Sequence, residues 1–401
     1  MNSALQGKKV LLGVTGSIAC YKGVDLVSRL VKAGCSVQVL MTPTAAEFVR
    51  PLSFESITQR PVYLELTRTP DSWEMEHIEY ARWGDLLLVA PATATTLARL
   101  ACGLAGDAVS STYLAFQGPV FVAPAMNHAM WTHSATQDNI RCLQARGVRI
   151  IMPESGRLAC GEVGVGRLAD IHTIVETLES FFAEARLLAG KRVVITSGPT
   201  REYIDPVRFL SNPSTGKMGQ AMAEEAAAMG AEVVLITGPV AGPLPPVNVV
   251  HHVTTALDML EKARQEVPRS DIAIFAAAVS DYRPAQTGDR KLKRADKDTL
   301  SLELIQNPDI AATLGRDKRP DQCFIGFAAE TNDLETEARR KLAEKHLDFI
   351  VANPVGCEGA GFGADTNRGL LISVDGPAES IPPMTKRDMA RLILRRAAGI
   401  K

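Results

Sequence analysis

The chain has 401 residues, of which 46% are hydrophobic and 22% charged, and its formal net charge is -1. This composition is typical of a globular protein long enough for two domains, and it excludes a disordered chain. A nearly neutral chain has no overall positive charge to attract nucleic acid or an anionic membrane. Any phosphate binding therefore has to depend on local groups. The N-terminus lacks the apolar core of a signal peptide, and we expect a cytoplasmic protein.

The first half alternates short apolar runs with helical patterns. We expect buried strands at residues 10–14, 37–41, 85–90, 120–123 and 148–152, and a final helix at about 171–188. This alternation predicts a parallel sheet with right-handed crossovers.

The second half repeats the opening of the first. Gly190-Lys191-Arg192-Val193 echoes Gly7-Lys8-Lys9-Val10, and strands are expected at 193–196, 233–237, 272–276, 324–327, 349–351 and 370–374, with a closing helix at 386–398. We therefore predict two tandem Rossmann-like α/β domains with doubly wound, mostly parallel sheets, at 1–188 and 189–401. The polar segment 281–298 is predicted to be a mobile loop over a site.

The loop at 13–19, Gly-Val-Thr-Gly-Ser-Ile-Ala, follows the first strand with small residues that suit a phosphate at a helix start. It lacks the Gly-x-Gly-x-x-Gly fingerprint, and the second strand ends in Met41-Thr42-Pro43 without an acidic residue. A mononucleotide such as FMN suits it better than NAD, and a plain tight turn is the alternative. The loop at 90–96 is similar, with a helix N-cap as its alternative.

Two further segments of the first half carry chemistry. Residues 124–131 read Pro-Ala-Met-Asn-His-Ala-Met-Trp, and Cys160 stands in a polar, glycine-rich loop where no core cysteine is expected. The seven cysteines include no Cys-x-x-Cys pair, which argues against a disulfide framework or a structural zinc site. His128 and His133 have a spacing that could suggest a metal site, but no third ligand accompanies them, which argues against one.

Residues 7–180 resemble the flavin-containing cysteine decarboxylases, on the Pro-x-Met-Asn-x-x-Met-Trp pattern, a histidine before the third strand (His77) and a flap cysteine (Cys160). The resemblance implies a flavodoxin-like fold with Cys160 as proton donor, His77 as base or positioning group, and Asn127 gripping the substrate carboxylate. A surface histidine is the alternative for His77. The implied FMN contacts are Gly16, Ser17, Ile18, Thr42, Ala92, Thr93 and Ala94, and the implied substrate contacts are Met126, Asn127 and Ala159.

The decarboxylation needs an electron sink that a cysteine carboxylate lacks. Flavin oxidation at the carbon bearing sulfur would give a thioaldehyde, whose C=S group accepts the electrons released with CO₂. Reduction of the resulting enethiol then needs a proton donor, which is the role implied for Cys160.

In the second half, residues 211–219 read Ser-Asn-Pro-Ser-Thr-Gly-Lys-Met-Gly at the start of an expected helix. This is no Walker A loop, because methionine follows the lysine. The segment Ser214, Thr215, Gly216 and Lys217 is still suited to a phosphate or carboxylate, with a capped helix and a solvated lysine as the alternative. Asp281 and the lysines on later loops indicate a triphosphate and its metal ion.

The motifs Ser-Asn-x-Ser-x-Gly-Lys-Met-Gly, Asp-Tyr-Arg, Lys-x-Lys, Asn-Pro-Asp-Ile and Gly-Phe-Ala-Ala-Glu-Thr together resemble phosphopantothenate–cysteine ligases. The resemblance implies that 4'-phosphopantothenate attacks CTP to give an acyl cytidylate, and that the L-cysteine amine then displaces CMP. Asn212 would contact the acyl intermediate, Lys291 would lie on a flap, and Asp281 would hold Mg²⁺ or Mn²⁺. The implied CTP contacts are Ala277, Ala278, Asp281, Lys291, Asn307, Pro308, Asp309, Ile310, Ala311, Phe327, Lys341 and Lys345.

We therefore expect a bifunctional enzyme of coenzyme A biosynthesis, whose first half decarboxylates the 4'-phosphopantothenoylcysteine made by the second. One alternative is an NAD(P)-dependent oxidoreductase, which the missing fingerprint disfavours. The other is a non-catalytic flavoprotein, which the joint presence of His77, Asn127 and Cys160 disfavours. The resemblance also implies a homo-oligomer with trimer contacts around the flavin and dimer contacts through the ligase, together a dodecamer.

Overall fold

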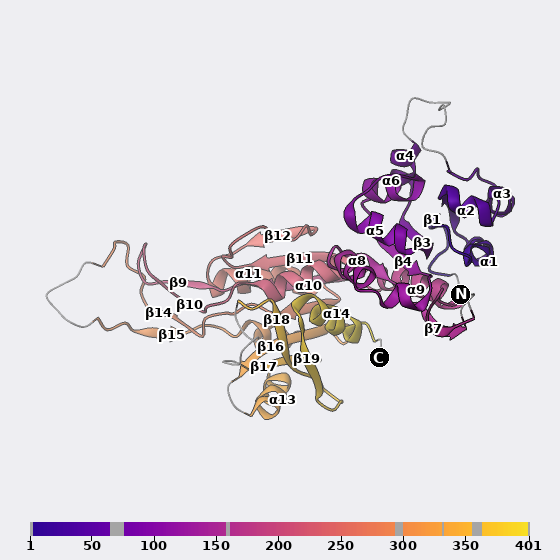
Figure 1. Cartoon of the computed structure of the whole chain (residues 1–401). Coiled ribbons are helices and arrows are strands. Elements are labelled where there is room, and N and C mark those ends of the chain that lie inside the picture. Colours follow the sequence, from indigo (N-terminus) through magenta and orange to yellow (C-terminus); the bar gives the residue numbers. More distant parts are fainter. Residues whose placement is uncertain are drawn as a thin grey trace. The chain divides into compact units, whose positions relative to one another are not determined.

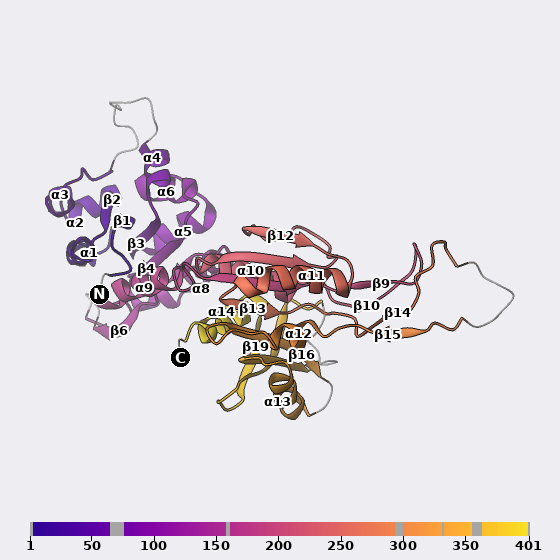
Figure 2. The same ribbon diagram turned by 180° about the vertical axis from the view of Figure 1, so that it is seen from behind.

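The computed structural model describes residues 3–64, 76–157, 161–292, 300–330, 333–354 and 363–399. The chain divides into two compact units, Met1–Ala183 and Glu184–Lys401. Figure 1 labels many of the elements of both units, and Figure 2 shows the same ribbon from behind. Among the described residues, no helix is long and apolar enough to cross a membrane.

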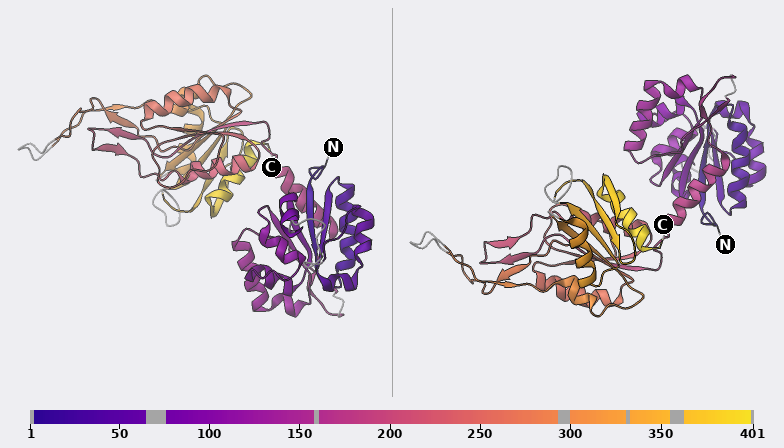
Figure 3. Two further views of the ribbon diagram at one scale, coloured as in Figure 1. Left: turned by 90° about the horizontal axis from the view of Figure 1, so that it is seen from above. Right: turned by 90° about the horizontal axis from the view of Figure 1, so that it is seen from below.

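The first unit contains a parallel sheet with the strand order β2-β1-β3-β4-β5. This is the flavodoxin-like doubly wound order, whose switch point lies between β1 and β3. Helices cover both faces of the sheet (Figure 3). The strands are β1 Lys9–Val14, β2 Ser36–Met41, β3 Leu86–Ala92, β4 Val120–Pro124, β5 Arg149–Ile150, β6 Glu154–Arg157 and β7 Val163–Arg167, the last two forming a separate hairpin. The helices are α1 Cys20–Lys32, α2 Pro43–Phe48, α3 Pro51–Thr58, α4 Glu76–Trp83, α5 Ala94–Cys102, α6 Ala108–Ala115, α7 His128–Thr132, α8 Ser134–Ala145 and α9 Ile171–Glu184.

The second unit contains an eight-stranded sheet with the order β12-β11-β8-β13-β16-β17-β18-β19. Its first six strands are parallel and follow the Rossmann order 3-2-1-4-5-6, with the switch point between β8 and β13, while β18 and β19 pair antiparallel at one edge. The strands are β8 Arg192–Ser197, β9 Arg201–Tyr203, β10 Phe209–Ser211, β11 Glu232–Thr237, β12 Val249–His252, β13 Ile272–Phe275, β14 Tyr282–Pro284, β15 Leu304–Gln306, β16 Cys323–Glu330, β17 Phe349–Pro354, β18 Thr366–Ser373 and β19 Glu379–Thr385. The helices are α10 Lys217–Ala228, α11 Ala256–Glu266, a 3-10 turn Val267–Arg269, α12 Ile310–Gly315, α13 Leu334–Glu344 and α14 Lys386–Ala397. The short ribbons β9–β10 and β14–β15 project from this sheet (Figures 1 and 2).

Each central strand reads as a nearly continuous apolar run because both of its faces are covered. In the first unit, Leu12 packs into one core cluster, and its neighbour Leu11 packs into the other on the opposite face. Side chains of successive strand residues point to opposite faces, so an apolar run fills both cores at once.

The predicted fold class is confirmed, while several predicted element bounds are wrong. The expected strand at 148–152 is only Arg149–Ile150, and the helix expected to end at 188 ends at Glu184. The polar loop around Cys160 is flanked by strands β6 and β7, and the segment after Asp281 begins with strand β14. Strand β19 contains Pro382 and Pro383, which an edge strand tolerates because its outward N–H groups need no partner.

Replacing Phe121 by Ala should destabilise the first unit by about 3–5 kcal/mol, because it empties a well-packed core position. Phe121 is 2% exposed, and Phe324 is its counterpart in the second unit at 1%. We expect Phe121→Ala to speed amide hydrogen exchange in β1 to β4, and Phe324→Ala to speed it in β13, β16 and β17. Equal acceleration in both units by either variant would contradict separate cores.

Candidate functional site

A cavity of about 840 Å³ lies at the switch point of the first unit. It is lined by the loops that follow β1, β2, β3 and β4, and by the β6–β7 hairpin. Ligand cavities in open α/β sheets occupy this place and have this size. Of the residues predicted from sequence, the cavity brings together Gly16, Ser17, Ile18, Thr42, Thr93, Ala94, Met126 and Asn127.

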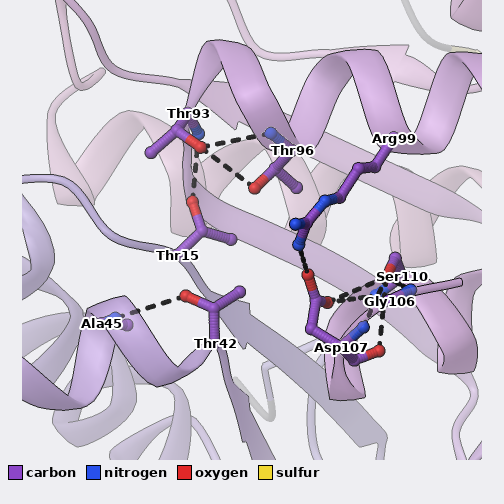
Figure 4. A network of polar contacts seen from close by, with 9 residues as sticks. All are labelled: Thr15, Thr42, Ala45, Thr93, Thr96, Arg99, Gly106, Asp107 and Ser110. Carbon is purple, nitrogen blue, oxygen red and sulfur yellow. Dashed lines mark hydrogen bonds and ion pairs between the residues drawn. The ribbon is translucent and has the colours of Figure 1, made fainter. Parts of the chain in front are cut away.

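A buried threonine ties the loops on the two sides of this switch point. The Thr15 hydroxyl donates to the Pro91 carbonyl oxygen at 2.8 Å and accepts from the Thr93 backbone N–H at 3.0 Å. Thr93 in turn caps α5 by accepting from the Thr96 N–H at 3.2 Å, as Figure 4 shows. The cavity wall is therefore fixed by hydrogen bonds before any ligand arrives.

A cationic group is fixed on the same wall. Arg99 lines the cavity and forms an ion pair with Asp107 (Figure 4). Asp107 is 4% exposed and also caps α6, because its Oδ1 accepts from the Ser110 N–H at 2.8 Å. Arg99 therefore offers a held guanidinium to an anionic ligand.

Asn127 sits where the β6–β7 hairpin meets the loop after β4. Its Oδ1 accepts from the Ala129 N–H and caps α7, and its Nδ2 donates to Glu162 Oε2, both at 2.8 Å. The Met126 N–H donates to the Gly166 carbonyl oxygen at 2.9 Å. Gly166 has a φ of +148°, and a Cβ there would lie 2.3 Å from the Met126 carbonyl oxygen, so this close approach needs glycine.

Some predicted residues do not meet in this cavity. Cys160 and Ala159 lie outside the described residues. Ala92 is buried at the end of β3 and does not line the cavity. His77 lies in α4 and lines a separate depression with Ser111. The sequence reading missed the arginines of the lining, Arg99, Arg157 and Arg167, because they come from separate elements and form no motif.

Two cavities meet at the switch point of the second unit. The α10 cavity, of about 290 Å³, contains the predicted residues Asn212, Ser214, Thr215, Gly216, Lys217 and Ala278. The α12 cavity, of about 200 Å³, contains the predicted residues Asn307, Pro308, Asp309, Ile310, Ala311 and Lys345. Both are lined by Ala277, Val279, Asp281, Phe327 and Lys341.

The backbone of the loop after β13 is held by two side chains, one bonding to an N–H group and the other to carbonyl oxygens. Thr200, buried after β8, accepts from the Ser280 N–H at 3.0 Å. Asn212 Nδ2 donates to the carbonyl oxygens of Ala278, at 3.3 Å, and Val279, at 3.0 Å. These bonds fix the wall that the two cavities share.

The α12 cavity combines charges of both signs. Lys345 Nζ lies 2.9 Å from Asp309 Oδ2, and Asn307 Nδ2 donates to the Ser280 carbonyl oxygen at 2.8 Å. Among the described residues, no three His, Cys, Asp or Glu side chains gather as a metal site. A cation at Asp281 would therefore draw its other ligands from bound phosphate oxygens and water.

Lys291 is exposed and lines neither cavity. The segment that carries it is anchored at the following residue, because the Leu292 N–H donates to Asp205 Oδ2 at 3.1 Å. The sequence reading missed the cavity residues Asn353, Asn367 and Lys386. Asn353 is the last residue but one of the buried strand β17, which was a usable signal, whereas nothing local in the sequence marks Lys386.

Replacing Asp107 by Ala should destabilise the protein by about 1–2 kcal/mol, because α6 loses its cap. The change also releases Arg99. Asp138→Ala is the matched control, since it removes an exposed partner of Arg141 and should change the free energy of unfolding by less than about 0.5 kcal/mol. Equal effects in denaturant titrations would contradict the role of Asp107.

Replacing Asp205 by Asn should remove a pH-dependent part of the stability. Burial raises the pKa of Asp205, but backbone N–H bonds from Val207, Leu292 and Arg208 outweigh it and hold the pKa below its usual 3.8. The stability that a depressed pKa contributes is present above the unfolded-state pKa and is lost as the pH falls through the folded-state pKa. The difference in free energy of unfolding between wild type and Asp205→Asn should therefore shrink from about pH 5 to about pH 2. A difference that stays constant with pH would exclude this contribution.

Comparison with known families gives a consistent result for both units. The Flavoprotein family profile matches residues 1–183, and the profile of the DNA/pantothenate metabolism flavoprotein C-terminal domain matches residues 188–400. The coenzyme A biosynthesis bifunctional protein CoaBC of Bacillus subtilis is 46% identical over 99% of this chain and 98% of its own length. The CoaBC proteins of Vibrio cholerae, 44% identical over 98% of both chains, and of Escherichia coli K12, 42% identical over 98% of this chain and 96% of its own, are similar along their whole lengths. The chain therefore belongs to the family of bifunctional coenzyme A biosynthesis proteins.

Proposed function

We propose that residues 189–401 ligate 4'-phosphopantothenate to L-cysteine with CTP, and that residues 1–188 decarboxylate the resulting 4'-phosphopantothenoylcysteine to 4'-phosphopantetheine with FMN. The observation that carries this proposal is the pair of adjoining cavities in the second unit, together with a separate cavity in the first. Two adjoining cavities suit a reaction in which a carboxylic acid and a nucleotide bind side by side and react with each other. Family membership supports the same pathway.

The ligation begins with activation of a carboxylate, which is a poor electrophile by itself. CTP occupies the α12 cavity and 4'-phosphopantothenate the α10 cavity. The substrate carboxylate attacks the α-phosphorus, pyrophosphate leaves, and an acyl cytidylate forms at the shared wall. Lys341 and Asp281 line that wall. Lys341 stabilises the charge of the triphosphate, and Asp281 would hold a Mg²⁺ or Mn²⁺ ion that would supply the same stabilisation.

Asn212 acts at the same wall. Its Nδ2 donates to two backbone carbonyl oxygens. Its Oδ1 is then the atom that can accept from a donor group such as the cysteine amine, which attacks the acyl carbon and displaces CMP. Asn212 thus positions both the wall and the nucleophile.

The first cavity suits FMN in its chemistry as well as its size. Small and hydroxylated residues follow β1 and β3, and Arg99 adds a fixed positive charge for a phosphate. Bound FMN supplies hydride transfer at the carbon that bears sulfur, which creates the electron sink for loss of CO₂.

Asn127 Nδ2 grips the substrate carboxylate in this unit. In the structure that amide hydrogen is accepted by the Glu162 carboxylate. The substrate carboxylate replaces Glu162 as the acceptor, so binding requires the side chain of Glu162 to move away. Cys160, two residues earlier in the chain, then donates the proton that completes reduction of the enethiol.

One assay tests both activities. The purified protein is supplied with 4'-phosphopantothenate, L-cysteine and CTP, and pyrophosphate, CO₂ and 4'-phosphopantetheine are measured. All three should form, and omission of CTP should abolish all three. Failure to form any CO₂ from supplied 4'-phosphopantothenoylcysteine would refute the decarboxylase assignment.

The variant Cys160→Ala separates the two units in the same assay. It should release pyrophosphate at the wild-type rate, because its ligase unit is unchanged. Formation of 4'-phosphopantetheine should fall at least about a hundredfold, as expected when a proton donor is lost. A wild-type rate of 4'-phosphopantetheine formation would show that Cys160 is not the donor.

A further inference from the structure

Lys386 is a buried lysine that faces the α10 cavity. It is the first residue of α14, is only 8% exposed, and contributes to the cavity lining. Its backbone N–H donates to the Asp365 carbonyl oxygen at 3.1 Å. Over the part of the chain that the structure describes, no carboxylate forms an ion pair with its Nζ. A buried ammonium group costs free energy unless an opposite charge compensates it.

A second lysine stands close to it and already has a counterion. Lys217 Nζ lies 2.6 Å from Asp365 Oδ1 and 3.0 Å from the Gly363 carbonyl oxygen. Burial lowers the pKa of Lys386, the charge of Lys217 lowers it further, and Asp365 opposes both effects. Two ammonium groups therefore share one carboxylate, which itself is largely exposed at 88%.

The rest of the cavity adds to this excess of positive charge. Its lining contains Lys341 as a third lysine, and Asp281 is its only acidic residue among those described. Both Lys341 and Asp281 belong to the wall shared with the α12 cavity. Lys217 and Lys386 line only the α10 cavity, and among the described residues of that lining no acidic side chain lies outside the shared wall.

Neutral donors surround the same positions. The side chain of Asn367 accepts the Arg368 N–H through its Oδ1 at 2.9 Å, which leaves its Nδ2 to donate. The hydroxyl-bearing Ser214 and Thr215 precede α10 in the lining, and Gly216 caps that helix with a φ of +75°. Ammonium, amide and hydroxyl donors around a helix N-terminus form a donor set for a phosphoryl group.

We propose that Lys386 binds a phosphoryl group in the α10 cavity, together with Lys217. This inference rests on the proposed ligase function, which brings two such groups to the site. One is the phosphomonoester of 4'-phosphopantothenate, which the proposed function places in this cavity. The other is the triphosphate of CTP, which would have to extend from the α12 cavity across the shared wall to reach Lys386. Either anion supplies the charge that buried Lys386 lacks.

The variant Lys386→Gln tests this assignment, with Lys386→Arg as the matched control that keeps the charge. In Lys386→Gln, the KM for the substrate whose phosphoryl group is bound should rise about tenfold or more, as expected for loss of a charge-assisted bond. Lys386→Arg should stay within about threefold of wild type. A rise for 4'-phosphopantothenate identifies the phosphomonoester, and a rise for CTP identifies the triphosphate. Unchanged values for both, or a rise for L-cysteine alone, would overturn the proposal.

Further measurements distinguish loss of anion binding from misfolding of the variant and from failure of the proposed function. Decarboxylation of supplied 4'-phosphopantothenoylcysteine should be unchanged in Lys386→Gln, and thermal unfolding should show that its second unit is folded. Titration with inorganic pyrophosphate measures the anion site without turnover, and Lys386→Gln should bind it about tenfold more weakly than wild type. If the wild type binds pyrophosphate more tightly than Lys386→Gln but performs no ligation, the proposed function fails and the anion site stands. Equal pyrophosphate binding by both proteins would refute the anion site whatever the ligase does.

Discussion

One buried threonine hydroxyl spans the switch point in each unit, and the cavity walls depend on it. Thr15 follows β1 and accepts the Thr93 N–H from the loop after β3. Thr200 follows β8 and accepts the Ser280 N–H from the loop after β13. A parallel sheet brings these loops to one edge, but the two sides of a switch point diverge. A hydroxyl that bonds backbone across this gap sets how far apart the walls of the ligand cavity stand.

The sequence predicted the parts of the fold that depend on local pattern. Apolar runs such as Leu86–Ala92 are buried on both faces, so their composition alone indicates a central parallel strand. The edge strand Glu379–Thr385 carries prolines and exposed polar residues, and such a pattern does not differ from that of a loop. The hairpin formed by Glu154–Arg157 and Val163–Arg167 could not be predicted either, because its glycines and polar residues are also typical of a loop.

The site could be predicted where its residues come in motifs, and not where the fold assembles it from single residues. Residues 211–219 supply a run of neighbours to the α10 cavity, and this run is visible in the sequence. Arg99 and Lys386 enter their cavities from helices whose sequences show ordinary surface charges. Their significance depends on tertiary neighbours: Asp107 holds Arg99, and Lys217 competes with Lys386 for Asp365.

The distribution of charge explains how a nearly neutral chain would bind the anionic substrates proposed for it. A net charge of -1 gives no long-range attraction, so recognition depends on a few lysines and arginines in cavities. Burying any of these cations without a counterion costs free energy. The chain supplies a counterion to some of them and not to others. Arg99 and Lys217 form ion pairs with Asp107 and Asp365, while Lys386 forms no ion pair of its own among the described residues. We therefore expect a bound phosphoryl group to compensate the charge of Lys386 more than that of the cations that already have aspartate partners.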